Sequence, residues 1–432
     1  MTALSRARRG AASIGVALAL LASARPARAE LTVDQAVGVA VQRNRDLIAA
    51  KLEIEITQVE RIAAGIYPNP VLQYTVGNLV LGAGNPQSQG LSPSPFSQTV
   101  HQIGVTQVVD VWAKRNLRVK TAELSVETRR LLVEDVLREI AFTVRNAFAE
   151  VVREQFELDL NRTTKARYDD VVRISKARAT AGEISDFEFR KIELEGLKYQ
   201  NALIDATAEL DLARQGLAQV MGLPRVDDLP GPAAPTPIVR GPTAIGPLLE
   251  RAVESRPDVR AAKKSKALAE SMIASARREA YPDIFFGVAY THSEFVVSGD
   301  NGNTLALTIG APIPLFDRNQ AGIARARIES RRAQNEIDRL ALRVEYEVRE
   351  AIRHLERAAA TLDVYEGGGM LDRADGQLRV AENTYRLGQI TLLELLEAQR
   401  TYLETRGQFL KVQDDYRRAR FAVAHAVGEK NP

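Results

Sequence analysis

Residues 180–189 read TAGEISDFEF and residues 386–395 read RLGQITLLEL, and these two stretches decide the fold. Each contains a glycine, an isoleucine two residues later, a hydroxyl residue next, and a carboxylate six residues after the glycine. The glycines, Gly182 and Gly388, are 206 residues apart in a chain of 432 residues. A spacing of nearly half the chain predicts an internal duplication in which each copy makes the same turn.

Further matches at nearly the same offset extend the duplication over almost the whole chain. The matching pairs are RNRDLIAAK (43–51) with SRPDVRAAK (255–263), VRNAFAE (144–150) with VREAIRH (348–354), and Gly222 with Gly428. We therefore predict two repeats, at residues 30–222 and 248–430. The segment between them, 223–247, contains seven prolines and predicts an extended, non-helical linker.

The N-terminus and the composition limit the class of protein. Residues 1–29 combine arginines, an apolar run from Ala11 to Ala22 and small residues near Ala29, which predicts a secretory signal peptide that is removed. The absence of cysteine excludes disulfides, thiolate metal sites and a lipid anchor on cysteine. With 58 basic and 55 acidic residues, the net charge of +3 does not indicate nucleic-acid binding.

Helical segments fill most of each repeat. Residues 31–66 and 245–280 predict the opening helical segments, and residues 112–179 and 318–386 predict one long helix per repeat. The apolar positions of the long helices alternate between spacings of four and three, which is typical of a coiled-coil seam. These positions are Val133, Leu137, Ile140, Val144, Ala147 and Val151 in the first helix, and Ile337, Ala341, Val344, Val348, Ala351 and Leu355 in the second.

A returning helix follows each glycine turn, at residues 185–222 and 391–428. The opening stretches are therefore predicted to be the tips of antiparallel helical hairpins, with Gly182 and Gly388 in the left-handed conformation that ends a helix. Gly367, Gly368 and Gly369 lie inside the second long helix and predict a kink or local unwinding there.

Four short segments change the period from helical to alternating, and they predict strands at residues 71–80, 101–111, 283–292 and 303–315. Their apolar side chains fall on one face, with small or polar residues on the other. A length of about ten residues matches a tilted strand that crosses a bilayer. Aromatic residues at the strand–helix junctions favour a membrane-interface belt, namely Tyr67, Trp112, Tyr281 and Phe316. The alternative is two soluble hairpins that cap a coiled coil.

Four strands are too few to close a barrel in lipid, where every backbone polar group must be hydrogen-bonded. The chain is therefore expected to oligomerise: two copies supply eight strands and three supply twelve, and a barrel wide enough to pass solutes favours three. The predicted fold is mainly α with a small β part. Three copies would join their strands in one twelve-stranded barrel, and their helices would form a tube below it that continues the pore.

This layout resembles the outer membrane factor family of Gram-negative bacteria, the TolC-like channels of tripartite efflux pumps and type I secretion. The resemblance rests on the duplicated turns, the strand entries ITQVER…YPNPVLQ and YPDIFF, and the helix ends at Gly222 and Gly428. The YPNPVL entry and the lack of a lipidation cysteine look more like the heavy-metal-efflux, CzcC-like subgroup.

The resemblance implies a homotrimer in the bacterial outer membrane with a large periplasmic portion. In such a trimer the duplicated coiled-coil hairpins would form a periplasmic α-barrel, and four strands per chain would contribute to a 12-stranded outer membrane β-barrel. It implies two partners, a periplasmic adaptor (membrane fusion) protein and an inner-membrane RND-type pump or ABC exporter. The channel itself would use no cofactor and catalyse no reaction, and heavy-metal cations are the first expectation for its cargo. Drug efflux and type I protein secretion stay open as alternatives, as does a soluble periplasmic coiled-coil adaptor or scaffold.

The resemblance also assigns roles to the hairpin tips. The residues expected to contact the adaptor are Gly182, Glu183, Ile184, Ser185, Gly388, Gln389, Ile390 and Thr391. Glu394 and Glu397 are expected to ring the periplasmic aperture, with Tyr385 helping to hold the gate closed. An arginine expected two residues after Gly388 is Ile390 here, so the latch differs.

Glu394 and Glu397 lie one helical turn apart, so three copies would place six carboxylates around an opening and concentrate cations there. The alternative is a solvated polar face on which Arg400 is the local partner. The four histidines, His101, His292, His354 and His425, lie far apart in the sequence and show no metal-ligand spacing. No catalytic motif is present, and we predict neither an enzyme nor a metal site.

Overall fold

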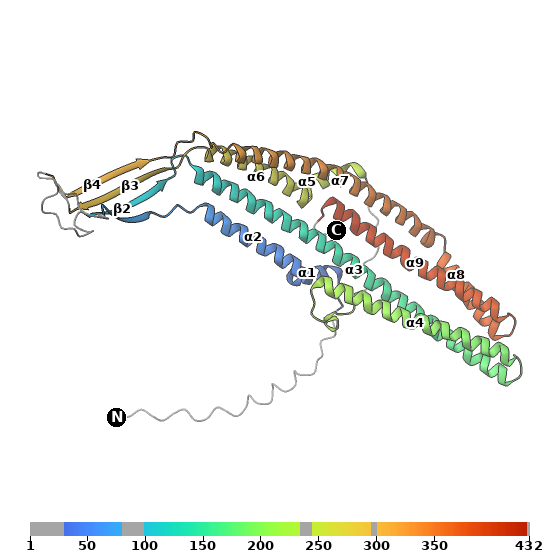
Figure 1. Cartoon of the computed structure of the whole chain (residues 1–432). Coiled ribbons are helices and arrows are strands. Elements are labelled where there is room, and N and C mark those ends of the chain that lie inside the picture. Colours follow the sequence, from blue (N-terminus) through green and yellow to red (C-terminus); the bar gives the residue numbers. More distant parts are fainter. Residues whose placement is uncertain (1–29, 80–98, 234–243, 295–299, 430–432) are drawn as a thin grey trace, which may run out of the picture. The chain divides into compact units, whose positions relative to one another are not determined.

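The computed structural model describes residues 30–79, 99–233, 244–294 and 300–429, and helices dominate it (Figure 1). The predicted signal peptide lies outside these residues, as does the middle of the predicted linker. The helices of the first repeat are α1 (Val33–Arg43), α2 (Arg45–Ala64), α3 (Lys114–Thr180), α4 (Asp186–Met221) and the 3₁₀ helix η1 (Val226–Asp228). Those of the second are α5 (Ile245–Ser255), α6 (Pro257–Glu279), α7 (Gln320–Gly367), α8 (Met370–Arg386) and α9 (Leu392–Val427).

The order of the elements occurs twice along the chain. Two helices, two strands, a long helix and a returning helix follow one another in the first half, and the same order recurs in the second half. The predicted fold class, mainly helical with a small β part and long helical hairpins, is confirmed. No helix among the described residues carries an apolar stretch long enough to cross a membrane.

Each opening helical segment is divided in two, which the sequence interpretation missed. The divisions lie at Asn44 and Arg256, whose backbones are extended, with ψ of 125° and 127°. Pro257 explains the second division, because a proline disfavours the helical conformation of the residue before it. No proline marks the first, where the Asn44 side-chain Nδ2 donates to the Val220 carbonyl at 2.9 Å.

The long helices follow the prediction with one change of register. α3 is continuous over 67 residues, whereas α7 ends at Gly367 and α8 begins at Met370, which confirms the predicted break. Gly369 has φ of +57°, a left-handed conformation that favours glycine. In the second seam Leu340 is buried and Ala341 is exposed, so the predicted position of Ala341 is wrong by one residue.

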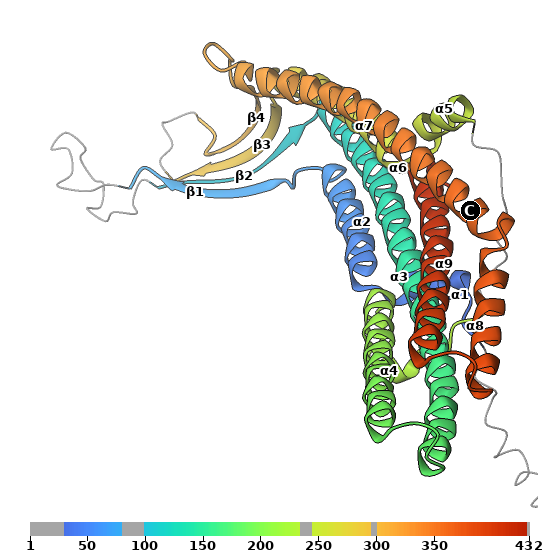
Figure 2. The same cartoon turned by 90° about the vertical axis from the view of Figure 1, so that its right-hand side faces the viewer.

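The strands form one antiparallel sheet in the order β1 (Val71–Gly77), β2 (Val100–Val109), β3 (Ile284–Ser293) and β4 (Asn303–Gly310), as Figure 2 shows. β4 ends five residues before its predicted end at residue 315. Pro312 and Pro314 account for the difference, because proline has no amide hydrogen to donate to a neighbouring strand.

The predicted linker is shorter and less extended than expected. The 3₁₀ helix η1 lies within it, and α5 begins at Ile245, inside the predicted range of 223–247. Leu31 forms an isolated parallel bridge with Pro232, so the described start of the linker is held against the N-terminal part of the chain. The prediction of a non-helical linker is therefore wrong at η1, whereas α5 begins at residue 245, where the second opening helical segment was predicted to begin.

The chain divides into two compact units, which we call the tip unit and the sheet unit. The tip unit comprises the described residues within 1–44, 140–241 and 357–421. The sheet unit comprises those within 45–139, 242–356 and 422–432. The core of the tip unit includes Tyr168, Ile192 and Tyr385, and the core of the sheet unit includes Val344, Ile352 and Val427.

Candidate functional site

Two rows of large apolar side chains cross one face of the sheet. The strand register aligns Leu72, Val105, Val288 and Leu307 in one row, and Tyr74, Ile103, Tyr290 and Leu305 in the next. All eight are exposed in the single chain, with Leu307 exposed by 79% and Leu72 by 69%. The alternation predicted from the sequence therefore produces a continuous uncovered apolar surface.

On the opposite face of the sheet, the two central rows carry small and polar residues. These rows are Gln73, Gly104, Ala289 and Ala306, and Thr75, Gln102, Thr291 and Thr304. β1 and β4 are the outer strands of the described sheet, and each presents one edge whose backbone groups have no strand partner within the sheet. This sheet has one apolar face, one polar face and two open edges.

Aromatic residues gather where the sheet meets the helices of the sheet unit. The Trp112 and Tyr281 rings are stacked with centroids 4.9 Å apart, and Trp112 Nε1 donates to the Pro282 carbonyl at 2.9 Å. The guanidinium of Arg115 lies 4.4 Å from the centroid of the Tyr67 ring. Phe316 is 89% exposed and lines a cavity of about 470 Å³ together with Tyr281. Of the four predicted belt residues, Trp112 and Tyr281 thus contact each other, Tyr67 contacts Arg115, and Phe316 is exposed.

Both hairpin tips have the predicted turn chemistry. Gly182 and Gly388 have φ of +78° and +70°. Ser185 Oγ accepts from the amide of Glu188 at 3.2 Å, so it caps α4. In the second tip Glu394 Oε2 accepts from the amide of Thr391 at 2.8 Å, and Thr391 Oγ1 accepts from the amide of Glu394 at 3.4 Å, a reciprocal capping box. A hydroxyl thus caps the helix start in each copy, and in the second copy the Glu394 carboxylate completes the box.

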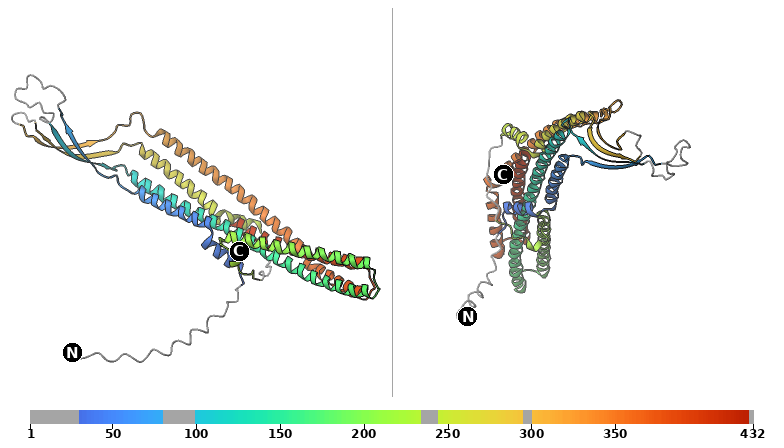
Figure 3. Two further views of the ribbon diagram at one scale, coloured as in Figure 1. Left: turned by 60° about the horizontal axis from the view of Figure 1, so that its bottom comes forward. Right: turned by 90° about the vertical axis from the view of Figure 1, so that its left-hand side faces the viewer.

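Tyr385 is buried in the tip unit between the two hairpins, which lie side by side (Figure 3). Its hydroxyl is 3.0 Å from Ser175 Oγ on α3. Arg178 of α3 lies over the Tyr385 ring at 5.6 Å and donates to the Tyr385 carbonyl at 3.4 Å. Arg178 Nε also donates to Glu183 at 3.1 Å.

Arg178 is the residue that sequence reasoning missed. The family resemblance places an arginine near Gly388 in the second repeat, but the arginine that contacts this turn comes from the first repeat. A Cβ atom added at Gly388 would lie 3.2 Å from Arg178 Nη2, so the glycine also makes room for it. Arg178 is 207 residues before Tyr385, and no local signal in the sequence links two positions that far apart.

Glu394 and Glu397 are both exposed, on the first two turns of α9. The hydrogen bonds from the Thr391 amide and hydroxyl lower the pKa of the Glu394 carboxyl. Arg400, the alternative local partner, donates to Glu404 at 2.9 Å. The Glu394 carboxyl is therefore held in its ionised form, and the hydrogen bond of Arg400 goes to a third carboxylate further along the helix.

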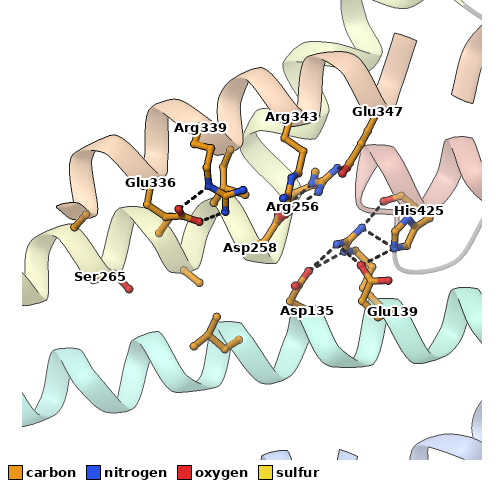
Figure 4. Close-up of a pocket in the computed structure, with 16 residues that line it drawn as sticks. Asp135, Glu139, Arg256, Asp258, Ser265, Glu336, Arg339, Arg343, Glu347 and His425 are labelled. Atoms are coloured by element: carbon orange, nitrogen blue, oxygen red, sulfur yellow. Dashed lines mark hydrogen bonds and ion pairs between the residues drawn. The ribbon is translucent and has the colours of Figure 1, made fainter. Parts of the chain in front are cut away.

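A charged cavity of about 350 Å³ lies in the sheet unit (Figure 4). Arg256, which is 2% exposed, donates to Asp258 at 2.7 Å, to Glu347 at 2.6 Å and to the Ala426 carbonyl at 3.1 Å. Burial opposes ionisation of Asp258, but the hydrogen bonds and charge of Arg256 lower the pKa of Asp258 below its ordinary value. Arg256 thereby links the junction of α5 and α6 to α7 and α9. We assign it a structural role.

The histidines are the remaining candidates for ligand binding. His425 Nε2 lies 2.8 Å from Arg138 and 3.0 Å from Glu139 in the charged cavity, and His354 lies 3.7 Å from Glu350 on α7. His101 and His292 face each other across β2 and β3. No group of three or more histidine, cysteine, aspartate or glutamate side chains within the described ranges is arranged to hold a metal ion.

Comparison with known proteins places most of the chain in one family. The family described as outer membrane efflux protein matches residues 36–223 and 248–429. The cobalt-zinc-cadmium resistance protein CzcC of Cupriavidus metallidurans is 24% identical over 94% of this chain and 91% of its own length. The pyoverdine export outer membrane protein OpmQ of Pseudomonas putida is 24% identical over 92% of this chain and 85% of its own length.

A solved structure shares the fold. CusC, whose structures concern conformational changes that accompany folding and transmembrane channel formation, matches 93% of this chain and 92% of its own chain. The TM-score is 0.73 and the sequence identity is 16%. A match over 93% of this chain takes in residues of both repeats.

Proposed function

The chain belongs to the outer membrane efflux protein family, and we propose that it is the outer membrane channel of a tripartite efflux system. It is a passive conduit and not an enzyme. In this proposal the sheet lies in the outer membrane and the helices extend into the periplasm. Energy for transport comes from an inner-membrane RND-type pump or ABC exporter, which the channel reaches through a periplasmic adaptor.

The apolar face of the sheet is the observation that carries the proposal. Eight large apolar side chains in two aligned rows are exposed, and the opposite face is small and polar. Lipid would cover the first face, and water would contact the second. The free edges of β1 and β4 need partners, because an unpaired backbone group in lipid costs several kcal/mol. We propose that three copies join edge to edge as a homotrimer with twelve strands.

The hairpin tips supply the proposed contact with the adaptor. Ile184 and Ile390 pack partly against the core of the tip unit, and Gly182, Glu183, Ser185, Gly388, Gln389 and Thr391 surround them. Glu394 and Glu397 face solvent near the tip of the second hairpin, where three copies would surround the periplasmic aperture. Tyr385, held by Ser175 and Arg178, joins the two hairpins and would keep this aperture narrow.

Divalent heavy-metal cations are the proposed cargo. CzcC, whose name states cobalt, zinc and cadmium resistance, matches a slightly larger share of this chain than OpmQ does. OpmQ is named for the export of pyoverdine at the same identity, and it favours a second candidate, export of small organic molecules. The two exposed carboxylates near the second tip, Glu394 and Glu397, support the cation proposal, because acidic side chains attract cations to an opening.

Cell fractionation tests the channel itself. We expect the chain in the outer membrane, released only by detergent. Cross-linking is expected to give the mass of three copies, and the purified protein is expected to conduct ions in planar bilayers.

The variant Leu307→Arg is expected to lose membrane insertion, since a cation on the lipid face costs about 2–4 kcal/mol at mid-depth. The matched variant Thr308→Arg, on the opposite face, is expected to insert. A periplasmic monomer that is silent in bilayers contradicts the proposal and supports a soluble scaffold.

Growth of a strain that lacks the gene tests the cargo. We expect its tolerance of Co²⁺, Zn²⁺ and Cd²⁺ to fall while its tolerance of dyes, detergents and antibiotics stays unchanged. Restoring the gene should restore metal tolerance. A strain that becomes sensitive to organic toxicants and keeps its metal tolerance would contradict the cation proposal and support export of small organic molecules.

A further inference from the structure

His101 and His292 are direct neighbours across the sheet although 191 residues separate them in the sequence. The register of β2 and β3 pairs them Cα to Cα, and the same row continues to Val76 on β1 and Asn303 on β4. Residues directly opposite in an antiparallel pair point to the same face, with Cβ atoms about 4.5–5.5 Å apart. Both imidazoles therefore extend from the same face as Ile103 and Tyr290.

Each imidazole is oriented by a hydrogen bond at its Nδ1 atom. His292 Nδ1 lies 2.8 Å from Asn303 Oδ1, which also accepts from the Tyr290 hydroxyl. A carbonyl oxygen can only accept, so the proton of a neutral His292 lies on Nδ1 and its Nε2 carries the lone pair. His101 Nδ1 lies 2.8 Å from the Tyr74 hydroxyl, which can accept the same kind of hydrogen bond.

This arrangement is typical of histidines that bind metal ions. In metal sites the second ring nitrogen of each histidine usually donates to an oxygen, which fixes the ring orientation and the tautomer. Here Asn303 and Tyr74 provide those oxygens, and the two Nε2 atoms belong to adjacent residues on one face. A single ion with metal–nitrogen distances of about 2.0–2.1 Å can bridge such a pair.

We propose that His101 and His292 form a binding site for one divalent cation per chain, of the class that prefers imidazole, such as Zn²⁺, Ni²⁺ or Cu²⁺. The row of His101 and His292 is the last one that spans all four strands, so it lies at the edge of the apolar face, where water can complete the coordination around the two protein ligands. Two ligands give a modest affinity and exclude Mg²⁺ and Ca²⁺, which prefer oxygen. The site lies at the end of the sheet remote from α3, and it does not depend on the proposed cargo or on the aperture.

Calorimetric titration with Zn²⁺ tests the site. The mature chain is purified in detergent through an affinity tag that contains no histidine. We expect one Zn²⁺ bound per chain, with binding lost in His101→Gln and in His292→Gln. The matched control is His354→Gln, which removes a half-exposed histidine of α7 and is expected to bind Zn²⁺ as the parent does. Mg²⁺ is expected not to compete.

The oxygen partner of His292 gives a second test. Asn303→Leu removes the acceptor and is expected to weaken Zn²⁺ binding about 10–100-fold, as loss of an outer-shell partner does in other sites. Asn303→Asp retains an acceptor and is expected to retain binding. Circular dichroism and gel filtration confirm that each variant is folded and assembled. Zn²⁺ binding that is unchanged in the His101→Gln, His292→Gln double variant, or lost equally in His354→Gln, overturns the proposal, whether or not the chain conducts ions.

Discussion

At the scale of single residues, Tyr385 shows how one side chain can hold two hairpins together. Its ring is buried, its hydroxyl lies 3.0 Å from Ser175 Oγ, and its carbonyl accepts from Arg178. Ser175 and Arg178 belong to the first repeat and Tyr385 to the second. The contact therefore joins the two copies at the place where each makes its turn.

We predict that Tyr385→Phe lowers the free energy of unfolding by about 1–2 kcal/mol, because the buried Ser175 hydroxyl loses this partner. Thermal unfolding of the detergent-solubilised protein measures the effect. The control is Tyr346→Phe, whose side chain is 71% exposed and whose change should stay within about 0.5 kcal/mol. Equal melting temperatures for the two variants would show that the hydroxyl contact does not stabilise the hairpins.

The buried pair of Arg256 and Asp258 leads to a prediction about pH. Arg256 holds the pKa of Asp258 below its ordinary value of 3.8, so the pair contributes its full stability above about pH 3.8 and loses it as the pH falls through the lower folded-state pKa. Asp258→Asn should therefore destabilise the protein by about 3–5 kcal/mol at pH 7, because it leaves a buried arginine with one ionised partner fewer.

Melting temperatures of the parent and Asp258→Asn between pH 7 and pH 3 test this prediction. The gap between the two proteins should be widest near neutral pH and should narrow only at the acid end of the series. Asp415→Asn, at an exposed position of α9, should follow the parent at every pH. A gap that stays constant down to pH 3 would mean that the carboxylate charge of Asp258 contributes nothing.

At the scale of elements, the glycine that ends each returning helix packs against the backbone at the point where an opening helical segment is divided in two. Gly222 has φ of +70°, and a Cβ atom there would lie 2.6 Å from the Arg43 carbonyl oxygen. Gly428 has φ of +79°, and a Cβ atom there would lie 3.1 Å from Arg256 Cα. The same close approach of backbone to backbone occurs in both copies, which explains why each copy has a glycine at this position.

We predict that Gly222→Ala destabilises the protein by at least about 1–2 kcal/mol, the cost of a left-handed conformation for a residue with a Cβ atom. The clash with Arg43 adds to this cost. Gly216→Ala, in the middle of the same helix with open space around it, should instead stabilise by up to about 1 kcal/mol. Denaturation by guanidinium, followed by circular dichroism, should separate the two variants in opposite directions from the parent.

At the scale of the whole molecule, the two repeats complete each other. β2 of the first repeat pairs with β3 of the second over ten residue pairs, which makes one four-stranded sheet from two hairpins. A two-stranded hairpin alone is marginally stable in water, so each copy needs the other. In the tip unit the two hairpins share one core, around Tyr168, Ile192 and Tyr385.

The proposed trimer leads to a prediction about ion selectivity. Glu394→Gln combined with Glu397→Gln should lower the preference of the channel for cations, because three copies lose six negative charges near one opening. Glutamine can still complete the capping box at Thr391, so the helix start is retained. The reversal potential in a salt gradient across a planar bilayer measures the change. The control is Glu404→Gln, which lies two to three turns further along α9. An equal shift of the reversal potential in the control and in the double variant would contradict the aperture role of Glu394 and Glu397.

Local chemistry made much of this fold predictable. Gly182 and Gly388 indicated the helix ends at the two tips, and both have the predicted left-handed conformation. The alternation of the strands indicated an apolar and a polar face, and the register places them so. Prolines altered the details: Pro312 and Pro314 shorten β4, and Pro257 divides an opening helix.

Periodicity and turn chemistry act between residues that are close in sequence, and for this reason the sequence by itself determined the duplication, the helical hairpins and the two-faced strands. Contacts between distant residues depend on which elements pack together, and only the tertiary structure decided them. It placed Arg178 against Tyr385, Asn44 against the end of α4, and His101 opposite His292. In each case the partners are separated by between 176 and 207 residues of the 432-residue chain. Local patterns carry no information over such distances, since the pairing is set by packing and strand register.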